Sequence, residues 1–272
     1  MFELKNKTVI ITGASSGIGK ALAYQFASEG ANLVLAARQY PLMCEIAQDI
    51  ENKFSVRAIA VATDVSKEEF CKHLIDEAMR LFGRIDVLVN NAGISMRALF
   101  EDVEMNVLKE LMDINFWGSV YCTKYALPHL LKVKGAIIGI SSIAGYKGLP
   151  GRTAYSASKF ALQGFLESVR IENLNKGLHV LVACPGFTSS NIRNVARSKD
   201  GSIQGESPLN ESKIMSAESV AERIVEALKN KKSELVMTAQ GKLTVWLNKF
   251  FPRLVDKLVF NHFAKEPDSP LK

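Results

Sequence analysis

The chain lacks the features of several broad classes of protein. Its four cysteines are widely scattered, with no CxxC pair and no histidine cluster nearby, so we expect neither a disulfide framework nor a metal site. No stretch holds about 18 uninterrupted apolar residues, which argues against a membrane span. The opening MFELKNKTVI leads into a strand-like run without the apolar core of a signal peptide, so we expect a cytoplasmic protein.

A strong charge of one sign is also missing. The 34 Lys and Arg residues against 28 Asp and Glu residues give a net charge of +6. The basic residues are dispersed and are not interleaved with aromatic residues, which makes nucleic acid a poor candidate ligand. No internal repeat or linker divides the 272 residues, and 47% of them are hydrophobic, enough for one substantial core.

What the sequence does contain is an alternation of short apolar runs with amphipathic stretches. Runs that are apolar on both faces are typical of parallel strands covered by helices. We therefore predict a doubly wound α/β sheet of the Rossmann type at residues 1–240, with a C-terminal helical extension at 241–272. The expected strands are 8–12, 32–37, 57–65, 86–93, 135–142, 179–186 and 234–238. The expected helices are 17–29, 41–52, 67–82, 103–131, 153–175 and 216–230.

A polar segment at 187–215, rich in Ser, Asn and Gly, follows the sixth expected strand. Proteins of the α/β class keep mobile binding loops at such strand ends, so we interpret this segment as a substrate lid.

The first expected strand leads into TGASSGIG, with glycines at 13, 17 and 19. A Gly-rich turn between a strand and a helix lets a phosphate approach the backbone and meet the free N–H groups of the helix. Arg38 follows the second expected strand, where an arginine pairs with a 2′-phosphate and an acidic residue would bind a free ribose 2′-hydroxyl. We therefore expect NADP(H) rather than NAD(H), with Ser15 and Ser16 as further donors to that phosphate.

Tyr155 and Lys159 lie one helical turn apart in YSASK, so a helix here would present both side chains on one face. Such a pair often only shares a solvated surface, and its spacing alone does not establish chemistry.

The motifs together resemble the classical short-chain dehydrogenase/reductase family over about residues 5 to 238. In the family's order and approximate spacing they are TGASSGIG at 12–19, DV at 64–65, NNAG at 90–93, Asn115 in MDINFWG, ISSIAG at 140–145, YSASK at 155–159 and PG at 185–186. The resemblance implies catalytic roles for Asn115, Ser142, Tyr155 and Lys159. With the residues above, the expected cofactor-binding set is Gly13, Ser15, Ser16, Gly17, Ile18, Gly19, Arg38, Asp64, Val65, Asn91, Tyr155, Lys159, Pro185, Gly186 and Thr188.

The resemblance also implies a division of labour. Tyr155 would be the acid/base, with a pKa lowered by the Lys159 ammonium together with the positive nicotinamide ring in the oxidised complex. Lys159 would also reach the nicotinamide ribose hydroxyls. Ser142 would hydrogen-bond the substrate oxygen, whereas strand alternation turns Ser141 the other way, toward a structural role. Asn115 would help to hold a water that links Lys159 to solvent. The family often has a Thr five residues beyond the Pro of PG, where this chain has a serine, which makes the anchoring of the lid to the nicotinamide less certain.

We therefore expect an NADP(H)-dependent oxidoreductase that interconverts a ketone and a secondary alcohol on a lipophilic substrate such as a steroid, a retinoid or a long-chain keto compound. A 3-keto thioester remains open as a substrate. The alternative from another class is an NADP(H)-binding sensor or scaffold without turnover, which the intact set of four catalytic residues disfavours. Extended relatives such as sugar-nucleotide epimerases carry a larger substrate domain than this chain has room for.

The tail at 241–272 has apolar residues at helical spacing and basic residues between them, and Pro252 should divide it into two short helices or kink it. Four interpretations stay open: packing on the chain's own core, a peripheral membrane contact, a flap over the substrate pocket and a dimer contact. Members of the family commonly associate through helices that correspond to 103–131 and 153–175, so we expect a homo-oligomer.

Overall fold

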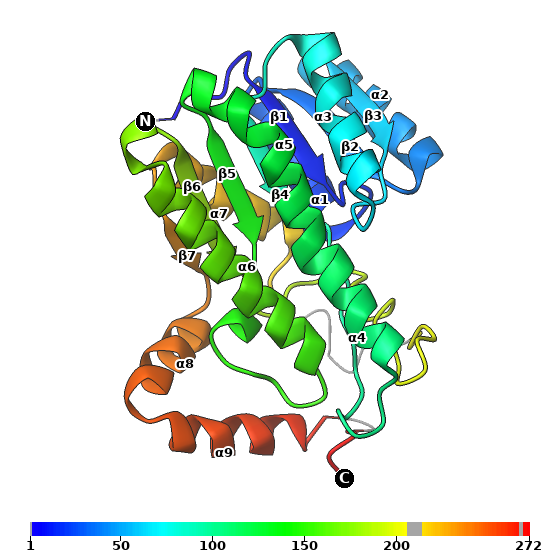
Figure 1. Cartoon of the computed structure of the whole chain (residues 1–272), viewed down its shortest axis with the longest axis vertical. Helices are drawn as coiled ribbons and strands as arrows, with labels where there is room; N and C mark the ends of the chain where they lie inside the picture. Colours follow the sequence, from blue (N-terminus) through cyan, green and yellow to red (C-terminus); the bar gives the residue numbers. More distant parts are fainter. Residues whose placement is uncertain (1, 206–213, 267–268) are drawn as a thin grey trace.

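The computed structural model describes residues 2–205, 214–266 and 269–272. Its centre is a parallel sheet of seven strands in the order β3-β2-β1-β4-β5-β6-β7 (Figure 1). Each strand coincides with one of the expected apolar runs, and the doubly wound fold class is confirmed. The strands are β1 (Thr8–Thr12), β2 (Asn32–Ala37), β3 (Ala58–Ala62), β4 (Val87–Asn90), β5 (Ala136–Ile140), β6 (His179–Cys184) and β7 (Glu234–Val236).

Helices cover both faces of this sheet, because side chains alternate between the faces along each strand. Val9 and Ile11 of β1 join one core cluster with three helices, and Ile10 joins the other cluster with three different helices. The first layer consists of α1 (Gly17–Ser28), α2 (Tyr40–Phe54) and α7 (Ala217–Lys229). The second consists of α3 (Glu68–Phe82), α5 (Gly118–Val133) and α6 (Thr153–Glu172).

The strand order reverses at β1, which pairs with β2 on one side and with β4 on the other. A doubly wound sheet opens a crevice at such a switch point, beyond the carboxyl ends of its strands. The glycine turn follows β1 and the NNAG motif begins at the end of β4, so both motifs lie at this crevice.

The expected helix at 103–131 is in fact divided. α4 (Met105–Met112) and α5 are joined by a π-helical turn, Asp113–Trp117. Short π-helical turns inside α-helices frequently occur at functional sites. This one carries Asn115, whose side chain bonds to the backbone of a neighbouring segment, and a sequence pattern of apolar residues does not reveal that contact.

The tail forms two helices, α8 (Ala239–Phe250) and α9 (Pro252–Phe263), and Pro252 begins the second as expected. Figure 1 shows both beyond the carboxyl end of β7, at the end of the molecule where the loop before α6 lies. The proposed lid at 187–215 includes residues 206–213, which lie outside the described residues. Among the described residues, no helix combines the length and apolarity needed to span a membrane.

Candidate active site

A cavity of about 1160 Å³ occupies the crevice at the carboxyl ends of the strands. Its wall contains every residue that the sequence analysis assigned to the site except two, Gly19 and Asn115, which lie behind it. The assigned wall residues are Gly13, Ser15, Ser16, Gly17, Ile18, Arg38, Asp64, Val65, Asn91, Ser142, Tyr155, Lys159, Pro185, Gly186 and Thr188.

The glycines of the first turn are required by the local geometry. Gly13 and Gly17 have φ of +66° and +52°, a conformation that side chains rarely adopt. A Cβ on Gly19 would lie 2.2 Å from the carbonyl oxygen of Gly13 and 2.5 Å from Nδ2 of Asn91. The turn therefore leaves its backbone open on the cavity side, which suits the close approach of a phosphate to the N-terminus of α1.

Asn91 holds this turn from the neighbouring strand. Its Nδ2 donates to the carbonyl oxygens of Thr12 at 2.8 Å and Gly13 at 3.2 Å, and its backbone N–H donates to Oγ1 of Thr12 at 3.0 Å. The carboxamide is therefore engaged in shaping the glycine turn, and the residue lines the cavity beside it.

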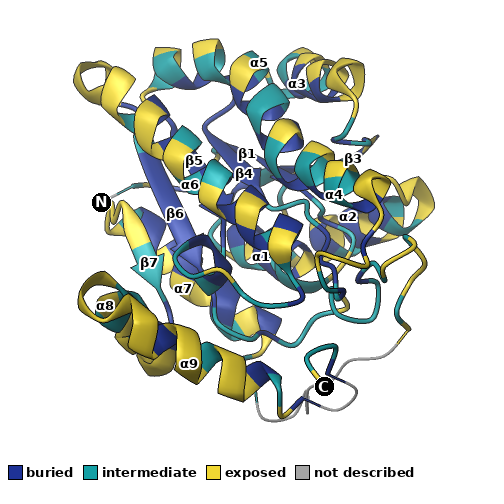
Figure 2. Ribbon diagram, turned by 60° about the horizontal axis from the view of Figure 1, so that its bottom comes forward, coloured by how far each residue is buried: buried dark blue, intermediate teal, exposed yellow. Residues whose placement is uncertain are grey.

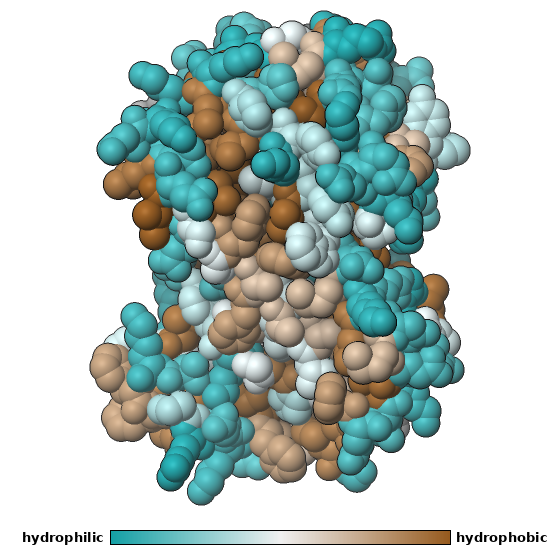
Figure 3. Space-filling model, viewed as in Figure 1, coloured by the Kyte–Doolittle hydropathy of each residue, from teal (hydrophilic) through white to brown (hydrophobic). Residues whose placement is uncertain are grey.

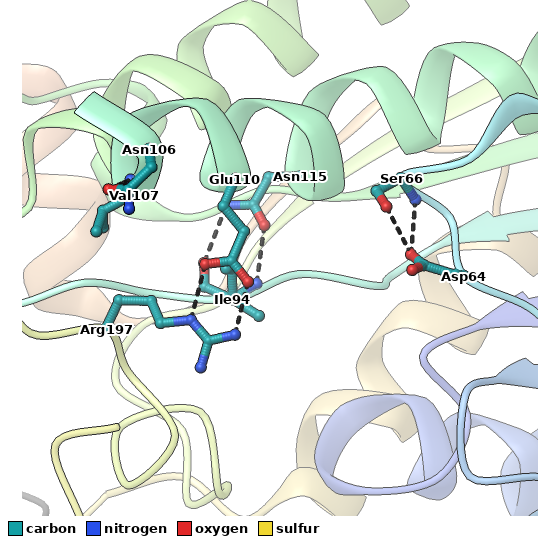
Figure 4. Close-up of polar contacts among 8 residues, drawn as sticks. All are labelled: Asp64, Ser66, Ile94, Asn106, Val107, Glu110, Asn115 and Arg197. Atoms are coloured by element: carbon teal, nitrogen blue, oxygen red, sulfur yellow. Dashed lines mark hydrogen bonds and ion pairs between the residues drawn. The ribbon is translucent and has the colours of Figure 1, made fainter. Parts of the chain in front are cut away.

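Beside the glycine turn, Arg38 is exposed and directly follows β2, whose Ala36 pairs with Thr12 of β1. Oδ1 of Asp64 accepts hydrogen bonds from the backbone N–H of Ser66 at 3.0 Å and from its hydroxyl at 2.8 Å (Figure 4). Val65 is buried against Gly118, where an added Cβ would lie 2.8 Å from the valine side chain. This packing fixes an apolar side chain at the cavity wall.

Ser142 and Tyr155 meet at the centre of the cavity wall. Ser142 follows β5 and caps a short 3₁₀ turn, its Oγ accepting from the N–H of Ala144 at 3.2 Å. Its side chain also hydrogen-bonds the phenol of Tyr155. Ser141 is turned away as expected, with its hydroxyl accepting from Nε2 of Gln163 at 2.9 Å.

The protein around the Tyr155 phenol raises its pKa. The lowering expected from the sequence includes the charge of an oxidised nicotinamide and stays a prediction for that complex. Burial is the largest cause of the rise, while the hydrogen bond from Ser142 and the charges of Arg152 and Arg193 act in the lowering direction. Desolvation thus outweighs the neighbouring donors and cations, and the phenol is held in its neutral form at neutral pH.

Lys159 is buried as well, with only 4% of its surface exposed. Its Nζ donates to the carbonyl oxygen of Ile140 at 2.8 Å and lies 5.7 Å from the centroid of the Tyr155 ring. Burial lowers the pKa of Lys159 to about 8. The ammonium therefore titrates close to the physiological range.

Asn115 hydrogen-bonds the segment that follows β4 and the helix that carries Tyr155 and Lys159. Its Oδ1 accepts from the N–H of Ile94 at 2.8 Å, and its Nδ2 donates to the carbonyl oxygen of Ile94 at 2.9 Å and to Oγ of Ser158 at 3.0 Å (Figure 4). A Cβ on Gly93 would lie 3.1 Å from Oδ1 of Asn115 and 3.6 Å from Nζ of Lys159. Gly93 therefore lets both side chains approach one place, a function of the NNAG motif that spacing alone does not show.

The described part of the proposed lid packs on the glycine turn and on the wall. Thr188 is buried, and its carbonyl oxygen accepts from Nη2 of Arg193 at 2.7 Å. A Cβ on Gly17 would lie 3.1 Å from Cβ of Ser190, the position where the family often has a threonine. Arg197 forms two hydrogen bonds with Glu110 of α4, at 2.8 and 2.6 Å (Figure 4).

The tail supplies a part of the wall that the site prediction did not name. Its contribution is mostly apolar and comes from Leu243, Leu247, Val255, Leu258, Val259 and Phe263. α8 packs closely at the base of the cavity, since a Cβ on Gly241 would lie 2.7 Å from Cδ1 of Ile143. The helical spacing of these apolar residues was the available sequence signal, and the flap interpretation is the one that matches their position.

Comparisons with known proteins agree with this geometry. A family model described as short chain dehydrogenase matches residues 7–201. The chain belongs to this family. An 11-beta-hydroxysteroid dehydrogenase A of Sesamum indicum is 35% identical, over 99% of this chain and 79% of its own length. An 11-beta-hydroxysteroid dehydrogenase 1A of Arabidopsis thaliana is 36% identical, over 93% of this chain and 74% of its own length.

Solved structures place the same fold among enzymes with bound nicotinamide cofactors. A short chain dehydrogenase/reductase from Burkholderia phymatum in complex with NAD has a TM-score of 0.84 at 26% identity, covering 93% of this chain and 96% of its own. An alcohol dehydrogenase from Thermococcus sibiricus complexed with 5-hydroxy-NADP has a TM-score of 0.76 at 26% identity, covering 86% and 96%. The protein is a short-chain dehydrogenase/reductase, an oxidoreductase of alcohol and ketone groups that uses a nicotinamide cofactor.

Proposed function

We propose that this short-chain dehydrogenase/reductase interconverts a ketone and a secondary alcohol on a lipophilic substrate, with NADP(H) as cofactor and Tyr155 as acid/base. One observation carries the proposal: Tyr155, Ser142 and Lys159 share a single cavity with the open glycine turn on one side and the apolar wall from α8 and α9 on the other. A dinucleotide and an apolar substrate would thus meet at the hydroxyls of Tyr155 and Ser142.

In ketone reduction, the bound nicotinamide supplies the hydride. Ser142 donates a hydrogen bond to the carbonyl oxygen of the substrate, and the neutral phenol of Tyr155 donates its proton to that oxygen as negative charge develops there. Burial holds the phenol neutral, which suits the acid that reduction needs. Lys159, with its pKa near 8, is poised to return a proton to the phenolate, and Asn115 fixes the backbone at Ile94 beside it.

The cofactor preference depends on Arg38. It directly follows β2, is exposed and lines the cavity, so its guanidinium is available for a 2′-phosphate. We expect Arg38→Asp to weaken NADPH binding by at least tenfold and to strengthen NADH binding, because a carboxylate repels the phosphate and accepts from a free 2′-hydroxyl. Fluorescence titration of both cofactors checks this. Arg57→Asp is the control, because Arg57 precedes β3 and so lies at the amino ends of the strands, away from the cavity. Equal affinities of the unchanged protein for the two cofactors would remove the NADP(H) assignment.

The substrate class is inferred from the apolar wall and from the relatives named as hydroxysteroid dehydrogenases. The direct test measures NADPH and NADH consumption against a panel of hydroxysteroids and ketosteroids, long-chain ketones and 3-keto thioesters. Tyr155→Phe keeps the ring but removes the exchangeable proton, so turnover should fall by about two to four orders of magnitude while NADPH still binds. Tyr125→Phe, which alters a phenol that bonds to Glu68 on α3, is the matched control.

Tight NADPH binding without turnover on any class of the panel would favour the alternative, a sensor or scaffold that binds NADP(H). Turnover that survives Tyr155→Phe would instead keep the oxidoreductase and reject Tyr155 as its acid/base.

We also propose a peripheral membrane contact through the outer face of α8 and α9. Large apolar side chains there are about half exposed, including Trp246 at 55%, Phe250 at 61% and Phe260 at 51%, and Figure 2 shows both helices as mostly exposed. Lys249 and Arg253 lie among them, a combination that favours an anionic lipid surface. Apolar substrates in such a surface would lie beside the cavity wall.

Co-sedimentation with vesicles of neutral lipid, with and without anionic lipid, tests this contact. Trp246→Ser combined with Phe250→Ser should abolish binding, whereas the similarly exposed pair Ile171→Ser and Leu174→Ser, at the C-terminal end of α6 and in the turn that follows it, should not. Unchanged sedimentation of the first variant would end the membrane proposal.

A homo-oligomer through α5 and α6 is proposed as well. Figure 3 shows apolar and near-neutral side chains along the middle of the face that α5 and α6 cover. Trp117 and Phe160 are 44% and 46% exposed there. Analytical ultracentrifugation of Phe160→Glu should show smaller particles than the unchanged protein, and identical masses would exclude this interface.

A further inference from the structure

Arg152 is a buried guanidinium for which the mechanism above assigns no role. It directly precedes α6, three residues before Tyr155, and lines the same cavity. Only 11% of its side chain is exposed. Its Nη2 lies 3.3 Å from Oε1 and 3.4 Å from Oε2 of Glu266, and its guanidinium carbon lies 4.6 Å from the centroid of the Phe263 ring.

The groups that hold Arg152 belong to the tail. Phe263 ends α9 and is 4% exposed, and the Glu266 side chain is 5% exposed. Figure 1 shows α9 running beneath the loop that leads into α6, so residues more than a hundred positions apart in the sequence meet here. A buried ion pair contributes little net stability, because desolvation offsets its attraction. The pair does fix the position of a charge, with a cation–π contact on one side and a carboxylate on another.

The charge fixed in this way acts on the phenol. Four polar groups around Tyr155 are placed by three elements: Ser142 after β5, Arg152 before α6, and Cys184 and Arg193 at the end of β6 and after it. The hydroxyl of Ser142 and the two arginines lower the pKa of Tyr155, and Cys184 raises it. His262 on α9 and Lys159 on α6 line the same cavity. Nη2 of Arg97 lies 3.5 Å from Oε2 of Glu266, so a second guanidinium shares this carboxylate.

The cations on either side of Tyr155 in the chain, Arg152 and Lys159, differ in the pH range over which they stay charged. Burial lowers the pKa of Lys159 to about 8 and raises that of Tyr155, so this ammonium loses its proton at a lower pH than the phenol does. Burial also lowers the pKa of Arg152, but a guanidinium remains protonated throughout the working range of a protein. Arg152 therefore offers a positive charge that does not titrate away.

We propose that Arg152 is a positioning residue for the acid/base step, which keeps a permanent positive charge beside Tyr155, and that Phe263 and Glu266 of the tail hold it there. The tail is then part of the reaction centre as well as a wall of the substrate pocket. The expected effect of Arg152 on turnover rests on the proposed role of Tyr155 as acid/base. The effect of Arg152 on the pKa of the Tyr155 phenol does not require turnover and is measured separately.

The first measurement uses the protein without cofactor. Tyrosine labelled with ¹³C at the hydroxyl-bearing carbon reports ionisation of each phenol by NMR, and Tyr155→Phe identifies the signal. Arg152→Met removes the charge at similar length, and we expect its phenol to ionise at higher pH than in the unchanged protein. Arg152→Lys keeps the charge and should restore part of the shift. Arg170→Met, near the other end of α6, is the control and should leave the titration unchanged.

The second measurement is the pH profile of alcohol oxidation, which requires the phenolate. For each unit by which Arg152→Met moves the rising limb toward alkaline pH, the rate constant at pH 8 should fall about tenfold and recover at higher pH. An unmoved limb with a raised KM would mean that Arg152 binds substrate instead, and would overturn the proposal. Absence of any turnover would count against the proposed function, while the NMR titration would still decide the effect on the phenol.

The holding role of the tail is tested by a double-mutant cycle. Glu266→Gln should change the titration of Tyr155 more when Arg152 is present than when Arg152 is already Met, because only the first background contains the guanidinium that the glutamate holds, while its second partner Arg97 is the same in both. Equal shifts in both backgrounds, or no shift in either, would overturn this part. Thermal unfolding of every variant separates these effects from a general loss of structure.

Discussion

The buried amine of Lys159 should make the unliganded protein less stable at neutral pH than a variant without it. Burial lowers the pKa of this lysine from 10.5 to about 8. A difference of that size corresponds to about 3 kcal/mol of folding free energy when both states are protonated. Lys159→Met removes this cost but leaves the carbonyl of Ile140 without its donor, which costs about 1 kcal/mol. The variant should therefore be more stable by about 2 kcal/mol at pH 7.

The pH dependence gives this prediction its sign. Below about pH 8 the folded lysine is charged and bears the full cost. Between pH 8 and 10.5 the unfolded state binds more protons than the folded one, so the stability of the unchanged protein rises with pH relative to the variant. By pH 10 most of the cost has gone, and the two proteins should be about equally stable.

Urea unfolding of both proteins at pH 7 and pH 10 measures the gap, with the exposed Lys132→Met as the control for loss of a surface charge. A gap that is the same at both pH values would refute the reasoning, because the advantage of the variant would then be unrelated to ionisation. Turnover of Lys159→Met should be lost at either pH. Lys159 would therefore lower the stability of the fold at neutral pH while being required for activity.

Three further predictions concern the cavity. Gly19→Ala should abolish cofactor binding in a fluorescence titration, because its Cβ would lie 2.2 Å from the carbonyl oxygen of Gly13, whereas Gly164→Ala, with open space around it, should bind cofactor normally. Leu247→Ser in the apolar wall should raise KM for apolar ketones severalfold with kcat little changed, and an equal loss in kcat would argue for a role in the chemistry instead. The rate of alcohol oxidation should rise with pH well past neutrality while ketone reduction does not, because burial raises the pKa of Tyr155; an oxidation rate independent of pH would contradict that assignment.

The fold and the conformation of the glycine turn could be predicted from the sequence because their signals are local. Apolar runs such as TVIIT determine where strands form, and a glycine turn such as TGASSGIG is required by backbone conformations within a few residues, as the positive φ of Gly13 and Gly17 shows. Both are properties of short segments, and periodicity and spacing record them directly.

The rest of the site depends on contacts between distant segments. The π-helical turn at Asn115 follows from bonds to Ile94, and the position of Arg152 follows from Glu266, 114 residues away. The burial that raises the pKa of Tyr155 also depends on such contacts, because the amount of surface that folding buries around a phenol is not a property of its neighbours in the chain.

The route of the chain around the cavity also bears on how such enzymes diversify. The glycine turn and Arg38 come from the first forty residues, whereas the apolar wall comes from α8 and α9, about two hundred residues later. Substitutions in the two tail helices can therefore reshape the pocket for a new substrate and leave cofactor recognition intact. Glu266 limits which tail substitutions are tolerated. Under the proposed role of Arg152, a tail that no longer held this guanidinium would change the ionisation of Tyr155 as well as the substrate pocket.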